Sequence, residues 1–94
     1  MKQIYQGANL QEVDLSYTNL AQATLVKSNL RNTNLEGAVL QEANLTDTNL
    51  EGANLSKSNL KKTLLRDANL RNANLEGSVL KEADLTEANF KVRT

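Results

Sequence analysis

The sequence contains no cysteine and no histidine. Without cysteine it can form no disulfide frame and no zinc–thiolate site, and without histidine it lacks the commonest general base and metal ligand. No apolar run exceeds three residues, which excludes a transmembrane helix. No longer apolar stretch follows Met1, so we expect no secretory signal peptide. These absences favour a cytoplasmic, non-enzymatic domain that uses no cofactor and no metal and does not enter a membrane.

The chain also lacks an excess of charge of either sign. Eleven Lys and Arg balance eleven Asp and Glu, so the formal net charge is zero. Nucleic-acid binders depend on an excess of positive charge that attracts phosphates, so we expect no direct binding to nucleic acid. At 94 residues the chain is short enough to form one domain, residues 1–94.

The most prominent feature of the sequence is a five-residue repeat. Leucine occupies every fifth position from Leu10 to Leu85, sixteen times in succession, with Tyr5 before and Phe90 after the series. The residue two positions before each leucine is small, with Val13 the largest, and the residue directly before it is usually Asn or Asp. The two positions after each leucine carry nearly all the charge. The repeat runs from about residue 3 to 92, in eighteen quintets.

A period of five fits neither an α-helix nor a flat strand. On a helix, five residues advance a side chain by about 140°, so the leucines would be scattered around the axis. On a flat strand, an odd step sends successive leucines to opposite faces. The chain must therefore bend after every quintet, so that each leucine returns to a common interior. This is a solenoid whose sides are one quintet long.

A longer echo in the sequence indicates how many sides each coil has. The segment from Asn29 to Leu50 recurs, with conservative changes, from Asn69 to Phe90, forty residues later. A three-sided coil of fifteen residues does not divide forty, and a two-sided coil encloses no interior, whereas a four-sided coil of twenty divides it. We favour four sides, although a duplication need not follow the coil length, so three sides stay an alternative at this point.

The repeat unit resembles that of the pentapeptide-repeat family. The unit A(D/N)LXX occurs here as GANLQ, EANLT, GANLS, DANLR, NANLE, EADLT and EANFK, and the resemblance covers about Gln3 to Val92. It implies an all-β fold, a right-handed quadrilateral β-helix of about 4.5 coils of 20 residues. It also implies that the leucine and the small residue two positions before it point inward, while the other three positions point outward.

In such a fold the leucines form the core as four ladders, one on each side. The predicted core residues are Leu10, Leu15, Leu20, Leu25, Leu30, Leu35, Leu40, Leu45, Leu50, Leu55, Leu60, Leu65, Leu70, Leu75, Leu80, Leu85 and Phe90. We expect the outward Asn residues to form an amide ladder with a structural role, and the four glycines to lie at corners that need a positive φ.

The open ends of a solenoid need either a cap or a partner. Met1, Ile4 and Tyr5 are candidates to cover one end of the core, and Phe90 and Val92 the other. The alternative is a homodimer formed through an end of the solenoid, which the resemblance to the family also supports.

The functional interpretation is a non-enzymatic scaffold for interaction with a protein partner that the sequence does not identify. Among the outward residues, Leu64 replaces the usual Asn and is our candidate for a partner contact. The acidic pairs Glu12 with Asp14 and Glu82 with Asp84 fall at solvated corners, where nothing raises a pKa as acid–base catalysis requires.

The alternative function is DNA mimicry, because some members of the resembling family bind DNA gyrase or protect it from quinolones. Duplex DNA carries about one charge per 1.7 Å, so a rod of roughly 20 Å would need about twelve negative charges. This chain has a net charge of zero, and no side exceeds minus two. The charge therefore argues against mimicry.

Overall fold

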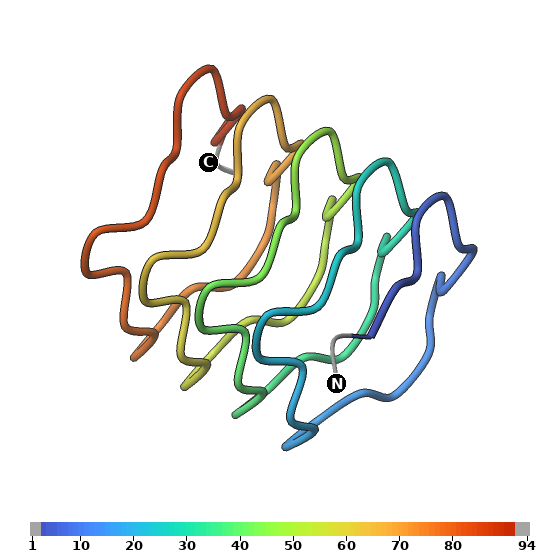
Figure 1. Ribbon diagram of the computed structural model, residues 1–94, viewed down its shortest axis with the longest axis horizontal. Coiled ribbons are helices and arrows are strands. Elements are labelled where there is room, and N and C mark those ends of the chain that lie inside the picture. Colours follow the sequence, from blue (N-terminus) through green and yellow to red (C-terminus); the bar gives the residue numbers. More distant parts are fainter. Residues whose placement is uncertain (1–2, 92–94) are drawn as a thin grey trace.

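The computed structural model describes residues 3–91, and these residues wind into a right-handed quadrilateral β-helix (Figure 1). The coils lie side by side along one axis, from the N-terminal coil, blue in the figure, to the C-terminal coil, red. Within residues 3–91 no helix forms, and each side of a coil contributes a single β-bridge residue rather than a longer strand. The bridge residue is the one directly before each leucine position.

The register between coils is constant along the whole described chain. Every β-bridge is parallel and joins a residue to the one twenty positions later, as in the series Asn9, Asn29, Asn49, Asn69 and Asn89. A three-sided coil would join residues fifteen apart, so the bridges confirm the four-sided coil and exclude the alternative. We number the sides from this series: the first contains Leu50, the second Leu55, the third Leu60 and the fourth Leu65.

Backbone hydrogen bonds join neighbouring coils at each side. Around Leu50, the N–H of Asn49 donates to the carbonyl of Ser28 at 3.1 Å, and that of Leu50 donates to the carbonyl of Asn69 at 2.8 Å. The N–H of Gly52 then donates to the carbonyl of Arg71 at 2.9 Å. One coil thus makes hydrogen bonds to the coil before it and the coil after it, which satisfies the backbone without a conventional sheet.

The corners are β-turns that place one residue in the left-handed region of φ. The N–H of Ala53 donates to the carbonyl of Leu50 at 3.0 Å, which closes the turn around Glu51 and Gly52. A positive φ at the third residue is typical of a type II turn. All four glycines have it, and so do thirteen other residues, among them Lys27 and Lys57. The positive φ predicted for the glycines is confirmed, but it does not explain why glycine occurs at only four corners.

Two of the glycines are explained by the side chain of the preceding coil. A Cβ atom at Gly37 would overlap the ring of Tyr17, and one at Gly52 would overlap the Oδ1 of Asn32. At Gly77 the nearest atom is the Cγ of Lys57, at an ordinary 3.7 Å. At Gly37 and Gly52, therefore, glycine makes room for a side chain that lies across the corner of the next coil.

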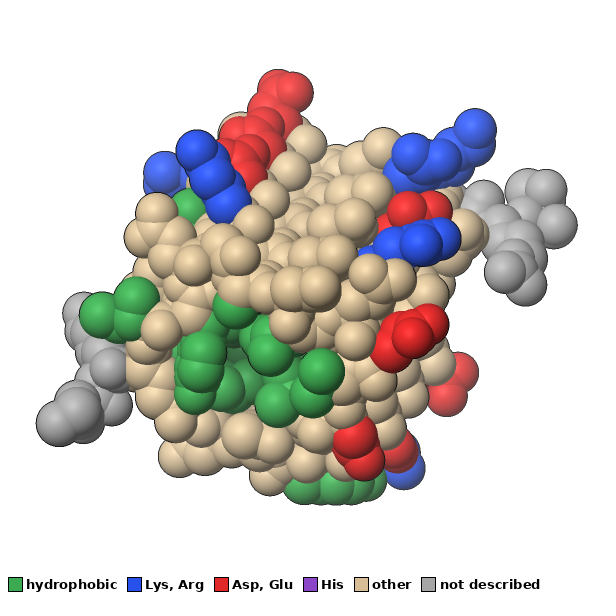
Figure 2. Space-filling view, turned by 90° about the vertical axis from the view of Figure 1, so that its right-hand side faces the viewer, with side chains coloured by type: hydrophobic (Ala, Val, Ile, Leu, Met, Phe, Trp, Pro, Cys, Tyr) green, Lys and Arg blue, Asp and Glu red, His purple; other side chains and the backbone are tan. Residues whose placement is uncertain are grey.

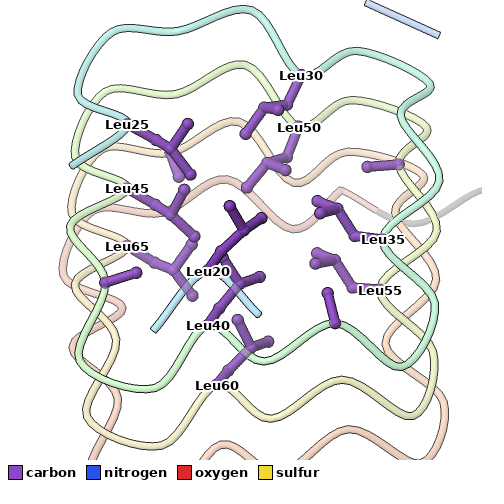
Figure 3. Packing of buried hydrophobic residues seen from close by; sticks show 14 of the residues in the cluster. Leu20, Leu25, Leu30, Leu35, Leu40, Leu45, Leu50, Leu55, Leu60 and Leu65 are labelled. Carbon is purple, nitrogen blue, oxygen red and sulfur yellow. The ribbon is translucent and has the colours of Figure 1, made fainter. Parts of the chain in front are cut away.

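The core lies on the axis and consists of stacked leucines, as Figure 3 shows for Leu20, Leu40 and Leu60 on the third side. From Leu20 to Leu70, all leucines in the fifth-position series are buried, with exposures between 0% and 3%. Burial of each such side chain contributes about 1.5–3 kcal/mol. Leu10, Leu15, Leu75, Leu80 and Leu85 are only partly buried and pack against this core.

Phe90 differs from the other predicted core residues. Its side chain is 39% exposed, because it follows the last full turn of the described chain and no described coil covers it. The prediction that Phe90 belongs to the core is therefore corrected: it lies at the edge of the core.

The small inward residues complete the interior without leaving polar groups unpaired. Ala23, Ala38, Ala43 and Ala53 are buried. The hydroxyl of Thr63 donates across coils to the carbonyl of Leu40 at 2.7 Å. Among the described residues, no buried side-chain nitrogen or oxygen lacks a hydrogen-bond partner.

The caps expected at the ends are only partly testable, since Met1 and Val92 lie outside the described residues. Ile4 forms the bridge to Thr24 and is 73% exposed, so it lies on the outside of the coil and does not cover the core.

Figure 2 views the molecule from the side of the N-terminal coil, where hydrophobic side chains gather near the middle of the face and charged ones lie toward its edges. This end of the rod therefore presents apolar surface.

Candidate functional site

The outer surface consists of the bridge residues and the two turn residues of each quintet, and hydrogen bonds fix most of the Asn side chains on it. In the first-side series, the Oδ1 of Asn49 accepts a hydrogen bond from the N–H of Glu51 at 3.1 Å. Asn29 and Asn69 accept the same hydrogen bond from the N–H two residues later, that of Arg31 and of Arg71. This is the Asx turn, in which the side chain stabilises the bend that follows it. The Asn residues therefore have a structural role in the turns.

The amide ladder expected along the first side is weakly developed. Only one contact joins two Asn side chains of neighbouring coils, from the Nδ2 of Asn69 to the Oδ1 of Asn49 at 3.5 Å, within the described residues. The oxygens are used for the local turn, so the ladder is not a chain of strong inter-coil hydrogen bonds.

Asp14 and Asp84 take the place of Asn and stay ionised. The side-chain hydrogen bond from Ser16 holds the pKa of Asp14 below its ordinary value. The hydrogen bonds from the hydroxyl of Thr86 and from Arg66 lower the pKa of Asp84 to about 2. A general acid at neutral pH needs a raised pKa instead. These two members of the acidic pairs are therefore turn residues with no feature of catalytic carboxyls.

Two ion pairs occur among residues 3–91. Arg66 Nε contacts Asp84 Oδ2 at 2.6 Å on the fourth side, and Arg31 Nε lies 3.8 Å from Glu51 Oε1 on the first. The alternating charges Arg31, Glu51 and Arg71 thus form one ion pair rather than a continuous ladder. Exposed pairs of this kind contribute little to stability, because water and salt screen them.

Leu64 lies on the fourth side, in a column of bridge residues between Asn44 and Asp84. It points outward, because the adjacent Leu65 is fully buried and successive residues of an extended segment face opposite ways. Its side chain is half-buried. It is the one leucine outside the inward series.

A group of lysines lies on the third side and at the corner that precedes it, and the charge sums of the separate sides conceal this group. We call Lys57, Lys61, Lys62 and Lys81 the basic stripe. Lys81 follows Lys61 by twenty positions and lies beside it in the next coil, as the parallel bridge between Asn59 and Val79 requires. No ion pair involves a lysine of the stripe among the described residues.

The described residues hold no group of acidic side chains arranged to bind a metal ion. They also contain no helix that is long and apolar enough to cross a membrane.

Comparison with known proteins identifies the repeat. Residues 2–75 match the family described as pentapeptide repeat region, and residues 63–91 match pentapeptide repeats (8 copies). The chain belongs to the pentapeptide-repeat family. No curated protein sequence shows a significant match.

Solved structures of pentapeptide-repeat proteins share the fold. The chain is 36% identical to HetL of the cyanobacterium Nostoc, a protein involved in the regulation of heterocyst differentiation, with a TM-score of 0.89 over 96% of this chain and 40% of that one. It is 44% identical to Rfr23 of the cyanobacterium Cyanothece, with a TM-score of 0.82 over 90% and 56%. For a pentapeptide-repeat protein of the Arabidopsis thaliana thylakoid lumen the identity is 29% and the TM-score 0.68, over 92% and 63%. The chain thus spans less than two thirds of the length of each.

Sequence reasoning placed Leu64 on the fourth side but missed the basic stripe. Adding the charges of each side hid it, because Glu42 and Glu82 offset Lys61 and Lys81. The signal was available, since a twenty-residue coil places Lys81 next to Lys61. A comparison of each residue with the one twenty positions later would have found it.

Proposed function

We propose that this pentapeptide-repeat protein is a non-enzymatic, cytoplasmic scaffold that binds a protein partner through its outer faces. The observation that supports this most is that inward and outward residues have different roles. Side chains of the inward positions make the core, while the residues that break the repeat, such as Leu64 and Val79, lie outside. A polar rod with a few exposed apolar residues has the composition of a surface for protein recognition.

Leu64 is the proposed contact on the fourth side. Asn at this position would restore the common repeat. Its Oδ1 could accept a hydrogen bond from the backbone N–H of Arg66, two residues later, as the Oδ1 of Asn49 does from Glu51. Leu64→Asn should therefore keep the fold while removing apolar contact area.

The test is quantitative affinity capture from a lysate of the source cells, with wild type, Leu64→Asn and Val39→Asn as baits. Val39→Asn is the matched control, since it makes the same kind of change on the third side. The scaffold function predicts proteins retained by wild type above an unrelated bait, and less of a specific protein with Leu64→Asn. Unchanged recovery removes Leu64 as the contact, and no retained protein at all contradicts the scaffold function.

A second copy of the chain is the proposed partner at the end of the rod. Phe90 is 39% exposed, and Leu80 and Leu85, which belong to the same C-terminal coil, are only partly buried. Phe90→Gln should therefore weaken self-association, whereas Ile4→Gln, on the outside of the coil, should not. Sedimentation over a range of concentrations measures this. A monomer at all concentrations for wild type would contradict the dimer.

DNA mimicry directed at gyrase is the alternative function, and charge argues against it. The rod has no net charge, whereas a mimic of equal length would need about twelve negative charges. No described feature favours it over the scaffold.

A further inference from the structure

The basic stripe on the third side is an arrangement that stability does not explain. Lys61 and Lys81 lie in the same column of neighbouring coils, about 4.8 Å apart at the backbone, and the N–H of Lys62 donates to the carbonyl of Lys81 at 2.9 Å. Like charges placed directly opposite each other in neighbouring strands are destabilising. In the same position of the first side, by contrast, Arg31 faces Glu51.

The remaining members of the stripe extend it around an apolar centre. Lys57 lies at the corner before the third side. Its Cγ lies 3.7 Å from the position that a Cβ at Gly77 would take, so the Lys57 side chain extends toward the next coil. Val79, on the bridge position of that coil, is 50% exposed. Lys57, Lys62 and Lys81 are exposed, and Lys61 partly so. The result is an exposed apolar residue among four lysines, with Glu82 beside Lys81 at the corner.

We propose that the basic stripe binds an extended acidic segment of a protein partner. A peptide with alternating carboxylates could place its charges opposite Lys61 and Lys81 and an apolar side chain against Val79. This inference rests on the proposed scaffold function and specifies the chemistry of the partner.

A protein segment fits this face better than a nucleic acid does. Binding to nucleic acid depends on many contacts between cations and phosphates, about 6–10 in a strongly salt-dependent binder, and this stripe offers four lysines. Glu42 and Glu82 flank Lys62 in the corner column, so any anionic ligand must keep its charges on the column of Lys61 and Lys81. An extended peptide with a carboxylate at every second residue can space its charges in this way, whereas a phosphate backbone carries a charge at every nucleotide. The exposed Val79 adds an apolar contact, which a phosphate backbone cannot use and a side chain can.

The test is fluorescence anisotropy of the whole chain with a labelled twelve-residue peptide that has aspartate at every second position and serine or valine between. A twin with asparagine in place of aspartate is the uncharged probe, and a twelve-base-pair DNA duplex represents the other class of ligand. Measurements at roughly 20 and 150 mM salt report the electrostatic part of binding.

Two double variants separate the stripe from net charge. Lys61→Gln with Lys81→Gln removes the centre of the stripe, and Lys27→Gln with Arg71→Gln removes the same charge from elsewhere. All four positions are outward, so circular dichroism should show the wild-type fold in both variants. We expect saturable binding of the aspartate peptide only, weakened about five- to thirty-fold in the stripe variant and less than about two-fold in the control.

Three results would overturn the inference. They are no saturable binding of the aspartate peptide, an equal loss in both double variants, and tighter binding of DNA that the stripe variant abolishes. If the aspartate peptide does not bind while affinity capture with wild type still retains a partner, the proposed role of the basic stripe is wrong and the scaffold function stands. If both fail, the scaffold function is contradicted as well.

Discussion

The ring of Tyr17 lies across Gly37 of the next coil and occupies the space of a Cβ atom at that corner. The same relationship joins Asn32 and Gly52. A side chain on one coil thus determines which residue the next coil accepts, although both corners have the same left-handed backbone.

This relationship predicts unequal effects of alanine at two corners of one column. Gly37→Ala should destabilise the protein more than Gly77→Ala, because both introduce a Cβ at positive φ but only the first displaces a ring. In a Tyr17→Ala background the difference should disappear, with a coupling of about 0.5–1.5 kcal/mol. Urea unfolding of the three single variants, the two double variants and wild type measures it. Equal losses at Gly37 and Gly77 would show that the ring moves aside at no cost.

A second prediction concerns the residues that adopt positive φ without being glycine. Lys27→Gly should stabilise the fold by about 0.5–1 kcal/mol, because the left-handed conformation costs a residue with a Cβ roughly 1–2 kcal/mol and the greater freedom of unfolded glycine offsets only part of that. Lys27→Ala is the control, since it removes the same charge and keeps the Cβ. A gain with alanine as large as with glycine would assign the effect to charge instead.

The burial of the core leucines predicts that truncating a leucine destabilises the fold more in the middle coils than at the ends. Leu50→Ala should cost about 2–5 kcal/mol, because its side chain is fully buried and the coils around it leave a cavity. Leu75→Ala should cost less, since that side chain is only partly buried. The urea midpoints report both. A midpoint for Leu50→Ala equal to that of wild type would contradict the inward position of the leucine.

The lowered pKa of Asp84 predicts how the free energy of unfolding depends on pH in the acid range. Its pKa is lowered from 3.8 to about 2 by the hydrogen bonds from Thr86 and Arg66. The ionised carboxylate therefore stabilises the folded state fully above about pH 4, and this contribution is lost as the pH falls through about 2. In Asp84→Asn, an Asn side chain can still accept the turn hydrogen bond but not the ion pair.

The stability difference between wild type and Asp84→Asn should thus shrink between pH 4 and pH 2. Glu76→Gln, which removes a carboxylate whose side chain makes no hydrogen bond to a described residue, is the control. Thermal unfolding across this range measures the three proteins. A difference for Asp84→Asn that stays constant down to pH 2 would show that the carboxylate has no special role.

Much of the fold could be predicted from the sequence because one periodic signal determines it. The spacing from Leu10 to Leu85 required a bend in every quintet, and the echo of Asn29 to Leu50 at Asn69 to Phe90 indicated a coil of twenty, which the bridges confirm. The contact of Tyr17 with Gly37 could not be predicted, because it depends on the direction of a side chain between coils. The outward position of Ile4 and the exposure of Phe90 depend likewise on what lies next to them at the ends.

The candidate site was less predictable because outward residues follow no periodic rule. Leu64 stood out by replacing Asn, yet its half-buried state depends on neighbours from other coils. The basic stripe was hidden by a sum that gave Glu42 and Lys61 equal weight, whereas binding depends on which charges lie in the same column.

The proposed function depends on the claim that a rod with balanced charge does not imitate DNA. A gyrase supercoiling assay, with the purified protein titrated in the presence and absence of a fluoroquinolone, tests this most directly. The charge predicts no inhibition and no drug protection at concentrations up to tens of micromolar. Inhibition or protection at lower concentrations would show that local shape outweighs net charge, and would establish DNA mimicry in place of the scaffold function.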